Sequence, residues 1–101
     1  MSYGLQNTTI EAINSVFRQY QDIDEVILYG SQTKKNYKTG SNIDLVLKGT
    51  NLALTDLLKI ENELDDLMLP YKIDVSLYHK INNPELIDHI QRVGMTWDFN
   101  F

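Results

Sequence analysis

Apolar and polar positions recur with helical spacing in some segments of the chain and alternate in others. The first helical segment predicts a helix from Thr8 to about Tyr20, opened by a capping box of Thr8 and Glu11. Its apolar positions recur every three or four residues and comprise Ile10, Ile13, Phe17 and Tyr20.

Three other segments have the patterns of strands. Residues 24–29 form a nearly continuous apolar run, which is typical of a strand that is covered on both faces. Residues 42–48 and 71–77 alternate instead, so each predicts a strand with one apolar face and one mostly polar face. The apolar faces carry Ile43, Leu45 and Leu47 in the first of these strands and Ile73, Val75 and Leu77 in the second; the opposite faces carry Asn42, Asp44 and Val46, and Lys72, Asp74 and Ser76.

Two helices are predicted between these strands. Ser31 can cap a brief helix that ends near Gly40, in a turn-forming stretch. The longest helix is predicted over residues 51–68, and Pro70 breaks it. We expect its inner face to comprise Leu54, Leu57, Leu58, Glu61, Leu64, Leu67 and Met68.

A last helix is predicted to begin at Asn83, with Pro84 in its first turn, and to end at Gly94. The tail, residues 95–101, alternates apolar and polar positions, as a short strand would. The whole order predicts an α/β fold in which helices pack on one small sheet, and mixed strand pairing is expected.

Composition narrows the class of protein. A chain of 101 residues predicts a single domain, residues 1–101, with one core. It has no cysteine, which excludes disulfides and thiolate metal sites, and no apolar run long enough to span a bilayer. The N-terminal residues lack the basic-then-apolar plan of a signal peptide. We therefore expect a cytoplasmic protein without a membrane partner.

The net charge is −5, from 14 acidic and 9 basic residues. This balance argues against an extensive nucleic-acid surface, which needs clustered lysine and arginine. The basic residues concentrate in one segment, at Lys34, Lys35 and Lys38, where a bound triphosphate would need them. A solvated, lysine-rich loop would have the same composition.

The polar faces of two predicted strands carry the candidate chemistry. Residues 42 and 44 point the same way, with Cα atoms roughly 6.5 Å apart by strand rise. If the strand with Asp74 is a neighbour, a further oxygen ligand joins Asn42 and Asp44. Magnesium prefers such oxygen ligands, and two ions can activate an attacking oxygen and stabilise a leaving pyrophosphate. Each aspartate alone is compatible with a structural role, so the hypothesis rests on their combination.

Gly30 and Ser31 follow the first predicted strand directly. Glycine lets a backbone approach a ligand closely, and a helix that begins there aims free backbone N–H groups at an anion. The same turn is common in purely structural loops. We therefore regard it as a phosphate site only together with the carboxylates that follow.

The segment from Gly30–Ser31 to Ser41–Leu45 resembles the motif of the minimal nucleotidyltransferases of the DNA polymerase beta superfamily, where Gly-Ser precedes a basic stretch and Ser-Asp-Ile-Asp-Leu. Residues 69–74 look like the family's third-carboxylate strand, and residues 90–94 resemble its closing helix. The resemblance runs from about residue 8 to residue 97. It implies a nucleotidyltransferase-like core, a small mixed sheet with helices packed on it.

The resemblance also implies a function. Members of the family transfer a nucleoside monophosphate, here expected to be AMP from ATP with two Mg²⁺ ions. Many are encoded as partners of HEPN-type helical proteins, and some of these act as antitoxins that modify the partner. By position, Gly30, Ser31 and Lys34 would bind the nucleotide. Asp44 and Asp74 would be catalytic and ligate metal, with Asn42 as the further metal ligand.

Asn42 is where the chain departs from the motif, since the family has aspartate there. An amide oxygen can ligate Mg²⁺ but brings no charge, which lowers the negative charge of the ligands from three to two. We expect weaker metal binding and slower transfer with the fold intact. The departure leaves open whether the chain is an enzyme.

Two alternatives to catalysis stay open at this stage. A degenerate nucleotidyltransferase could neutralise a HEPN-type partner by docking, and an exposed aromatic tail (Trp97, Phe99 and Phe101) would be a natural interface. Such aromatic residues are, however, more often buried in the core than exposed at an interface. A structural α/β domain with accidental motif matches is the other alternative, and the pattern leaves homo-oligomerisation open.

Overall fold

The computed structural model describes residues 5–29, 40 and 42–99. The brief helix predicted after Ser31 lies outside these residues. The described elements follow the predicted order, and a 3-10 helix (η2) that the sequence patterns did not indicate follows the third strand. In chain order they are α1 (Asn7–Phe17), β1 (Glu25–Tyr29), β2 (Asn42–Lys48), α2 (Leu54–Asp65), β3 (Lys72–Leu77), η2 (Tyr78–Lys80), α3 (Pro84–Val93) and β4 (Met95–Thr96).

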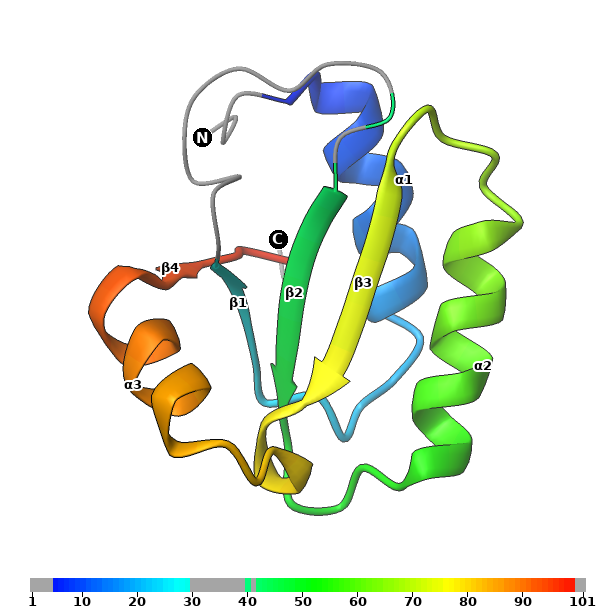
Figure 1. The fold of residues 1–101 in the computed structure, drawn as a ribbon. Helices are drawn as coiled ribbons and strands as arrows, with labels where there is room; N and C mark the ends of the chain where they lie inside the picture. The colour runs from blue at the N-terminus through cyan, green and yellow to red at the C-terminus, as the bar shows by residue number, and fades with distance from the viewer. Residues whose placement is uncertain (1–4, 30–39, 41, 100–101) are drawn as a thin grey trace.

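The four strands form one mixed sheet in the order β3-β2-β1-β4. β1 pairs antiparallel with β2 and with β4, whereas β2 pairs parallel with β3. The parallel pair requires a crossover connection, and α2 supplies it (Figure 1). The mixed pairing is thus as expected, and the two alternating strands, whose adjacency the sequence left open, are neighbours.

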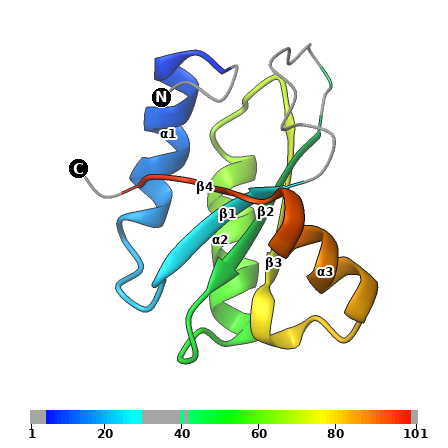
Figure 2. The same cartoon turned by 90° about the vertical axis from the view of Figure 1, so that its left-hand side faces the viewer.

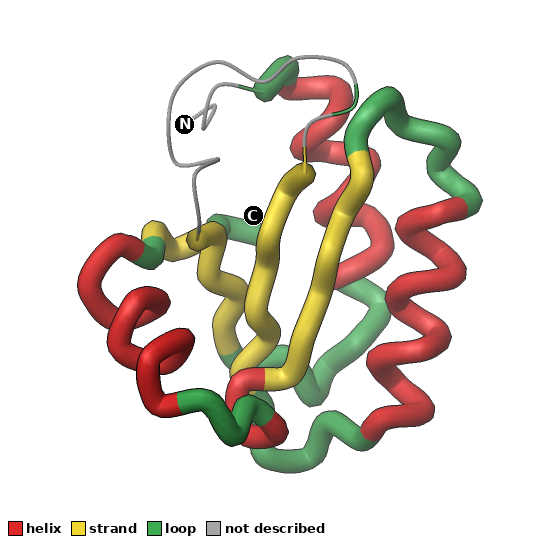
Figure 3. Tube along the Cα trace, viewed as in Figure 1, coloured by secondary structure: helices red, strands yellow, loops and turns green. Residues whose placement is uncertain are grey.

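The helices cover the two faces of the sheet unequally. Figure 2 shows α1 on one side of the strands and α3 on the other. Figure 3 shows α3 to the left of the yellow strands and α2 to their right. The core lies on the face covered by α1 and α2, where the inward positions of the strands are buried. Its strand residues are Val26, Leu28, Ile43, Leu45, Leu47, Val75 and Leu77. The opposite face, called the open face below, carries the polar positions of β2 and β3.

α3 approaches the open face of β1 closely. Its start is as predicted, because the Asn83 side chain accepts hydrogen bonds from the backbone N–H groups of Glu85 at 3.0 Å and Leu86 at 3.4 Å. Its end at Gly94 is also as predicted. A Cβ atom at Gly94 would lie 2.6 Å from Ile27 Cγ2, so glycine is what allows this contact.

The predicted start of α1 was wrong. The helix begins one residue earlier, Gln6 takes the N-cap position without a side-chain cap, and Phe17 ends it. Glu11 forms an ion pair with Arg18 on the exposed side of the helix and does not complete a capping box. The Glu11 carboxylate, which the capping-box motif would place at the helix start, thus pairs with Arg18, seven residues and about two helical turns further along.

The predicted inner face of α2 was also wrong in part. Ile60 and Leu64 are buried, but Leu54 is 59% exposed and Leu58 52% exposed. The apolar residues of this helix occupy two faces, and packing on β3 and α1 selects the one with Ile60. The helix also ends earlier than predicted, at Asp65, and Met68 follows with a positive φ of 55°.

The C-terminal segment packs into the core. Trp97 is 1% exposed and Phe99 is buried, which overturns the idea that these two residues form an exposed interface; Phe101 lies outside the described residues. The buried Asn14 holds the segment, since it accepts a hydrogen bond from Trp97 Nε1 at 2.6 Å and donates one to the Asp98 carbonyl at 3.0 Å. Within residues 95–99, only β4, at residues 95–96, is strand.

Candidate functional site

Asp44 and Asp74 lie side by side on the open face. They are direct partners in the parallel register of β2 and β3, and neighbouring strands are roughly 4.8 Å apart. The faces are fixed by the apolar positions on either side of each aspartate, which turn toward the core. The pairing that the sequence left conditional is therefore present, and two carboxylates project from one level of the sheet.

The pair is electrostatically unfavourable without a counter-ion. Partial burial raises the pKa of the Asp44 carboxyl, and the negative charge of Asp74 raises it further. Asp74 itself is exposed. A half-buried carboxylate beside a like charge needs a proton or a cation to compensate it, and it is therefore a candidate for a functional group.

Tyr29 also belongs to this site, although the apolar run of residues 24–29 favours a position in the core for it. It ends β1, is the register partner of Asp44, and is half-buried on the open face. Burial raises the pKa of its hydroxyl, a hydrogen bond with Ser76 lowers it, and the charges of Asp44 and Asp74 raise it again.

The contact with Ser76 shows how the Tyr29 side chain runs. Ser76 lies on β3 and Tyr29 on β1, so the tyrosine side chain reaches across β2. Its hydroxyl is close enough to both aspartates to feel their charges. The burial of residues 25–29 alternates although their sequence is a nearly continuous apolar run, so neither the face of Tyr29 nor its reach across a strand could be predicted from the sequence.

Asn42 begins β2, two residues before Asp44 on the same face, and is exposed. Its register partner on β3 is Lys72. The side chains at these four open-face positions therefore bring two negative charges and one positive charge. The net charge offered to a cation is smaller than the two aspartates alone would suggest.

These residues fit a hydrated Mg²⁺ ion better than a fully protein-enclosed one. Within residues 5–29, 40 and 42–99, no cluster of three or more His, Cys, Asp or Glu side chains could hold a metal. Magnesium is commonly bound by one or two carboxylates, with water and substrate phosphates completing its octahedron. Asp44, Asp74 and the amide oxygen of Asn42 match that donor set. The predicted nucleotide-binding residues Gly30, Ser31 and Lys34 lie outside the described residues.

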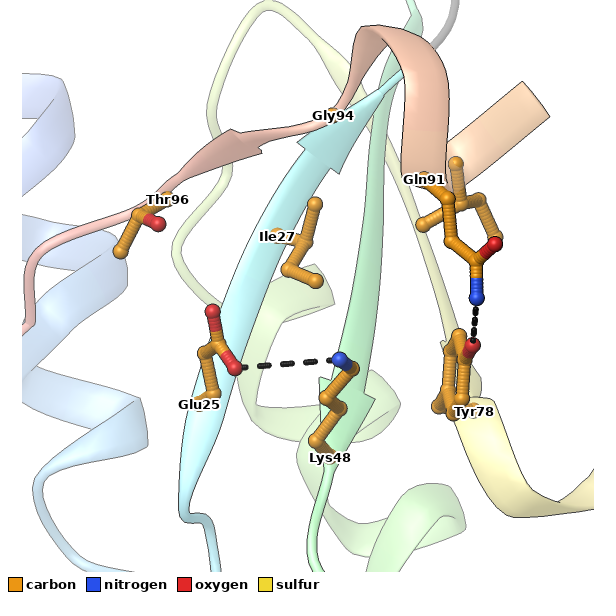
Figure 4. Close-up of a pocket in the computed structure, with 8 residues that line it drawn as sticks. Glu25, Ile27, Lys48, Tyr78, Gln91, Gly94 and Thr96 are labelled. Carbon is orange, nitrogen blue, oxygen red and sulfur yellow. Dashed lines mark hydrogen bonds and ion pairs between the residues drawn. The ribbon is translucent and has the colours of Figure 1, made fainter. Parts of the chain in front are cut away.

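A pocket of about 250 Å³ lies at the other end of the open face, between β1 and α3 (Figure 4). Its polar groups bind one another: Lys48 Nζ lies 3.9 Å from Glu25 Oε1, and Gln91 Nε2 donates to the Tyr78 hydroxyl at 3.1 Å. The Lys48 ammonium also lies 4.6 Å from the centre of the Tyr78 ring. Because these groups are mutually satisfied, we interpret this pocket as structural.

Comparison with known proteins identifies the family to which this fold corresponds. The family model described as polymerase beta, nucleotidyltransferase matches residues 11–96. Four chains of solved structures match, among them one from the crystal structure of a mutant of the toxin–antitoxin MntA–HpeT. That chain is 13% identical with a TM-score of 0.71, over 88% of this chain and 72% of its own length.

Two further observations are negative. No curated protein matches the sequence. Among the residues that the structure describes, no helix has the length and apolar character needed to cross a membrane.

The family match spans both aspartate strands and the elements that position them, and the chain belongs to the polymerase beta nucleotidyltransferase family.

Proposed function

We propose that this chain is the catalytic domain of a Mg²⁺-dependent nucleotidyltransferase that transfers AMP from ATP to a protein partner in the cytoplasm, at a rate lowered by Asn42. One observation carries the proposal: Asp44 and Asp74 are register partners on the open face, in a chain of this family. The raised pKa of Asp44 supports it, because burial and the charge of Asp74 both disfavour the ionised carboxyl, and a cation between the carboxylates would offset both effects.

In this proposal each residue has a separate task. Asp44 and Asp74 hold Mg²⁺, and Asn42 adds a neutral oxygen ligand. The metal, when bound, would supply charge stabilisation for the reacting phosphates. Gly30, Ser31 and Lys34 would hold the triphosphate.

The partner is proposed to be a HEPN-type helical protein that the chain neutralises as an antitoxin. The similar fold of a chain from the toxin–antitoxin MntA–HpeT supports the proposal of a role in a toxin–antitoxin pair. We further propose that residues 1–101 act as one domain. In this proposal the partner presents the acceptor hydroxyl to the aspartate pair.

The test is incubation with α-labelled ATP, Mg²⁺ and a HEPN-type protein encoded beside the chain. We expect slow transfer of label to that protein, faster transfer with Asn42→Asp, and none with Asp44→Asn. Asn62→Ser, on the exposed side of α2, is the control and should leave the rate unchanged. Absence of label even with Asn42→Asp would refute the proposal.

A second candidate is a degenerate family member that neutralises its partner by docking alone. Asn42 favours it, together with Lys72 beside it, because the charge available to hold metal is small. In that case Asp44→Asn with Asp74→Asn would leave neutralisation of the partner intact. Loss of neutralisation in this double variant, with the complex still formed, would exclude docking as the sole activity.

A further inference from the structure

One flank of α2 exposes apolar side chains that the core does not use. Leu54 and Leu58 lie one turn apart, and Met68, which follows the helix, is 86% exposed. These are the exposed large hydrophobic residues within the described part of the chain. We call the row formed by Leu54, Leu58, Glu61 and Asp65 the α2 stripe; all four residues are exposed.

Helical geometry places the α2 stripe away from α1. Tyr20, which follows α1, donates a hydrogen bond to the Glu63 carboxylate, so the Glu63 flank of α2 is the one turned toward α1. At 3.6 residues per turn, the stripe lies roughly 140–180° around the helix from Glu63. Ile60 and Leu64 occupy the buried face between the two flanks. The stripe is therefore a separate surface that nothing in the described chain covers.

The stripe lies on the same side of the molecule as the open face. Figure 1 shows α2 beside β3, which is one of the two edge strands of the described sheet, with α1 behind the strands. The flank turned away from α1 consequently faces the side on which β3 presents Asp74. Most partly buried apolar residues packed against the core also lie in α2, in β3 or in the connection between them: Leu57, Leu67, Leu69, Tyr71 and Ile73.

The apolar and charged residues of the α2 stripe indicate which kind of partner can bind there. Two leucines occupy its first half, and the carboxylates of Glu61 and Asp65 occupy its second half. A second copy of this chain would bring more carboxylates against them, because the chain carries a net charge of −5. A helix with an apolar row flanked by lysine or arginine would contact the two leucines with its apolar row and the two carboxylates with its basic side chains.

We propose that the α2 stripe docks a basic amphipathic helix of a partner protein. From Leu54 to Asp65 the stripe extends about 16 Å, long enough for three turns of a helix laid along it. A helix bound there would lie beside β3 and bring the partner next to Asp74. The inference rests on the proposed function for the existence of a partner protein, but not for any chemistry at the aspartate pair.

The test uses the full chain, labelled with ¹⁵N, and a synthetic peptide of about five helical turns with a leucine row flanked by lysines. Amide shifts should cluster on α2 and β3 and weaken at high salt, since exposed charges are screened. A peptide with glutamate in place of every lysine should not bind. Leu54→Ser with Leu58→Ser should weaken binding about tenfold, as expected for loss of two exposed leucine contacts.

The controls separate the outcomes. Thr55→Ser with Asn62→Ser changes exposed residues of the same helix outside the stripe and should leave binding unchanged. Asp44→Asn should also leave binding unchanged, so failure of catalysis and failure of docking can be told apart. Shifts centred on Asp74 and Asp44 without the stripe would overturn the proposal. Concentration-dependent shifts of the stripe without peptide would overturn it in favour of a second copy.

Discussion

Asn14→Ala is the sharpest test of how the C-terminal segment is held. Asn14 is fully buried, and its side chain accepts from Trp97 Nε1 at 2.6 Å and donates to the Asp98 carbonyl at 3.0 Å. Truncation leaves the buried indole N–H without this acceptor, which costs about 1–3 kcal/mol, and removes a second hydrogen bond worth about 0.5–1.5 kcal/mol. We expect a total loss of about 2–4 kcal/mol in the free energy of unfolding.

The assay is urea unfolding followed by the fluorescence of Trp97, the only tryptophan of the chain. A loss of this size lowers the urea midpoint by about 1–2 M for a small domain. Asn62→Ala is a matched control, because it makes the same substitution at an exposed position inside a helix. Both variants gain the helix propensity of alanine, so their difference reports the buried contacts alone.

Equal midpoints for Asn14→Ala and Asn62→Ala would refute this reasoning. They would mean that Trp97 does not depend on the polar contact inside the core. Native Trp97 fluorescence typical of a solvated indole would contradict the burial itself, and the C-terminal segment would again be a candidate interface.

Three further predictions concern single positions. Met68→Gly should raise the free energy of unfolding by about 0.5–1 kcal/mol, because Met68 is exposed and has a φ of 55°; a loss in urea unfolding would contradict this. Asn83→Ala should cost about 1 kcal/mol through loss of the cap of α3, and an unchanged urea midpoint would contradict it. Asp44→Asn in metal-free buffer should stabilise the fold at neutral pH. The raised pKa means that ionised Asp44 destabilises the native state above that pKa, so this gain should shrink as pH falls toward the ordinary range of aspartate. A gain that instead grew on acidification would contradict the sign.

The site was more predictable from the sequence than its surroundings. Alternation in β2 and β3 puts Asp44 and Asp74 on the mostly polar faces of their strands. A helix between the two strands favours a parallel crossover, which brings those faces together. Chain order thus favours the pairing that the structure shows, although it leaves open which strands are neighbours.

Long-range packing decided what the sequence could not. The leucines of α2 occupy two faces of the helix, and only the contact with β3 and α1 selects the buried one. Alternation in residues 95–99 fits an exposed edge as well as a buried segment, and the deciding partner, Asn14, lies 83 residues before Trp97. The reach of Tyr29 to Ser76 likewise depends on β2 lying between their strands.

The central claim is that Asp44 and Asp74 together form a divalent-cation site, and Mn²⁺ titration of the ¹⁵N-labelled chain tests it most directly. Amide signals near Asp44 on β2 and near Asp74 on β3 should broaden before all others. Asn42→Asp should lower the Mn²⁺ concentration required about tenfold, because it adds a carboxylate ligand. Asp44→Asn should abolish the effect. Broadening that begins at the acidic end of α2, or that is unchanged by Asp44→Asn, would contradict the account.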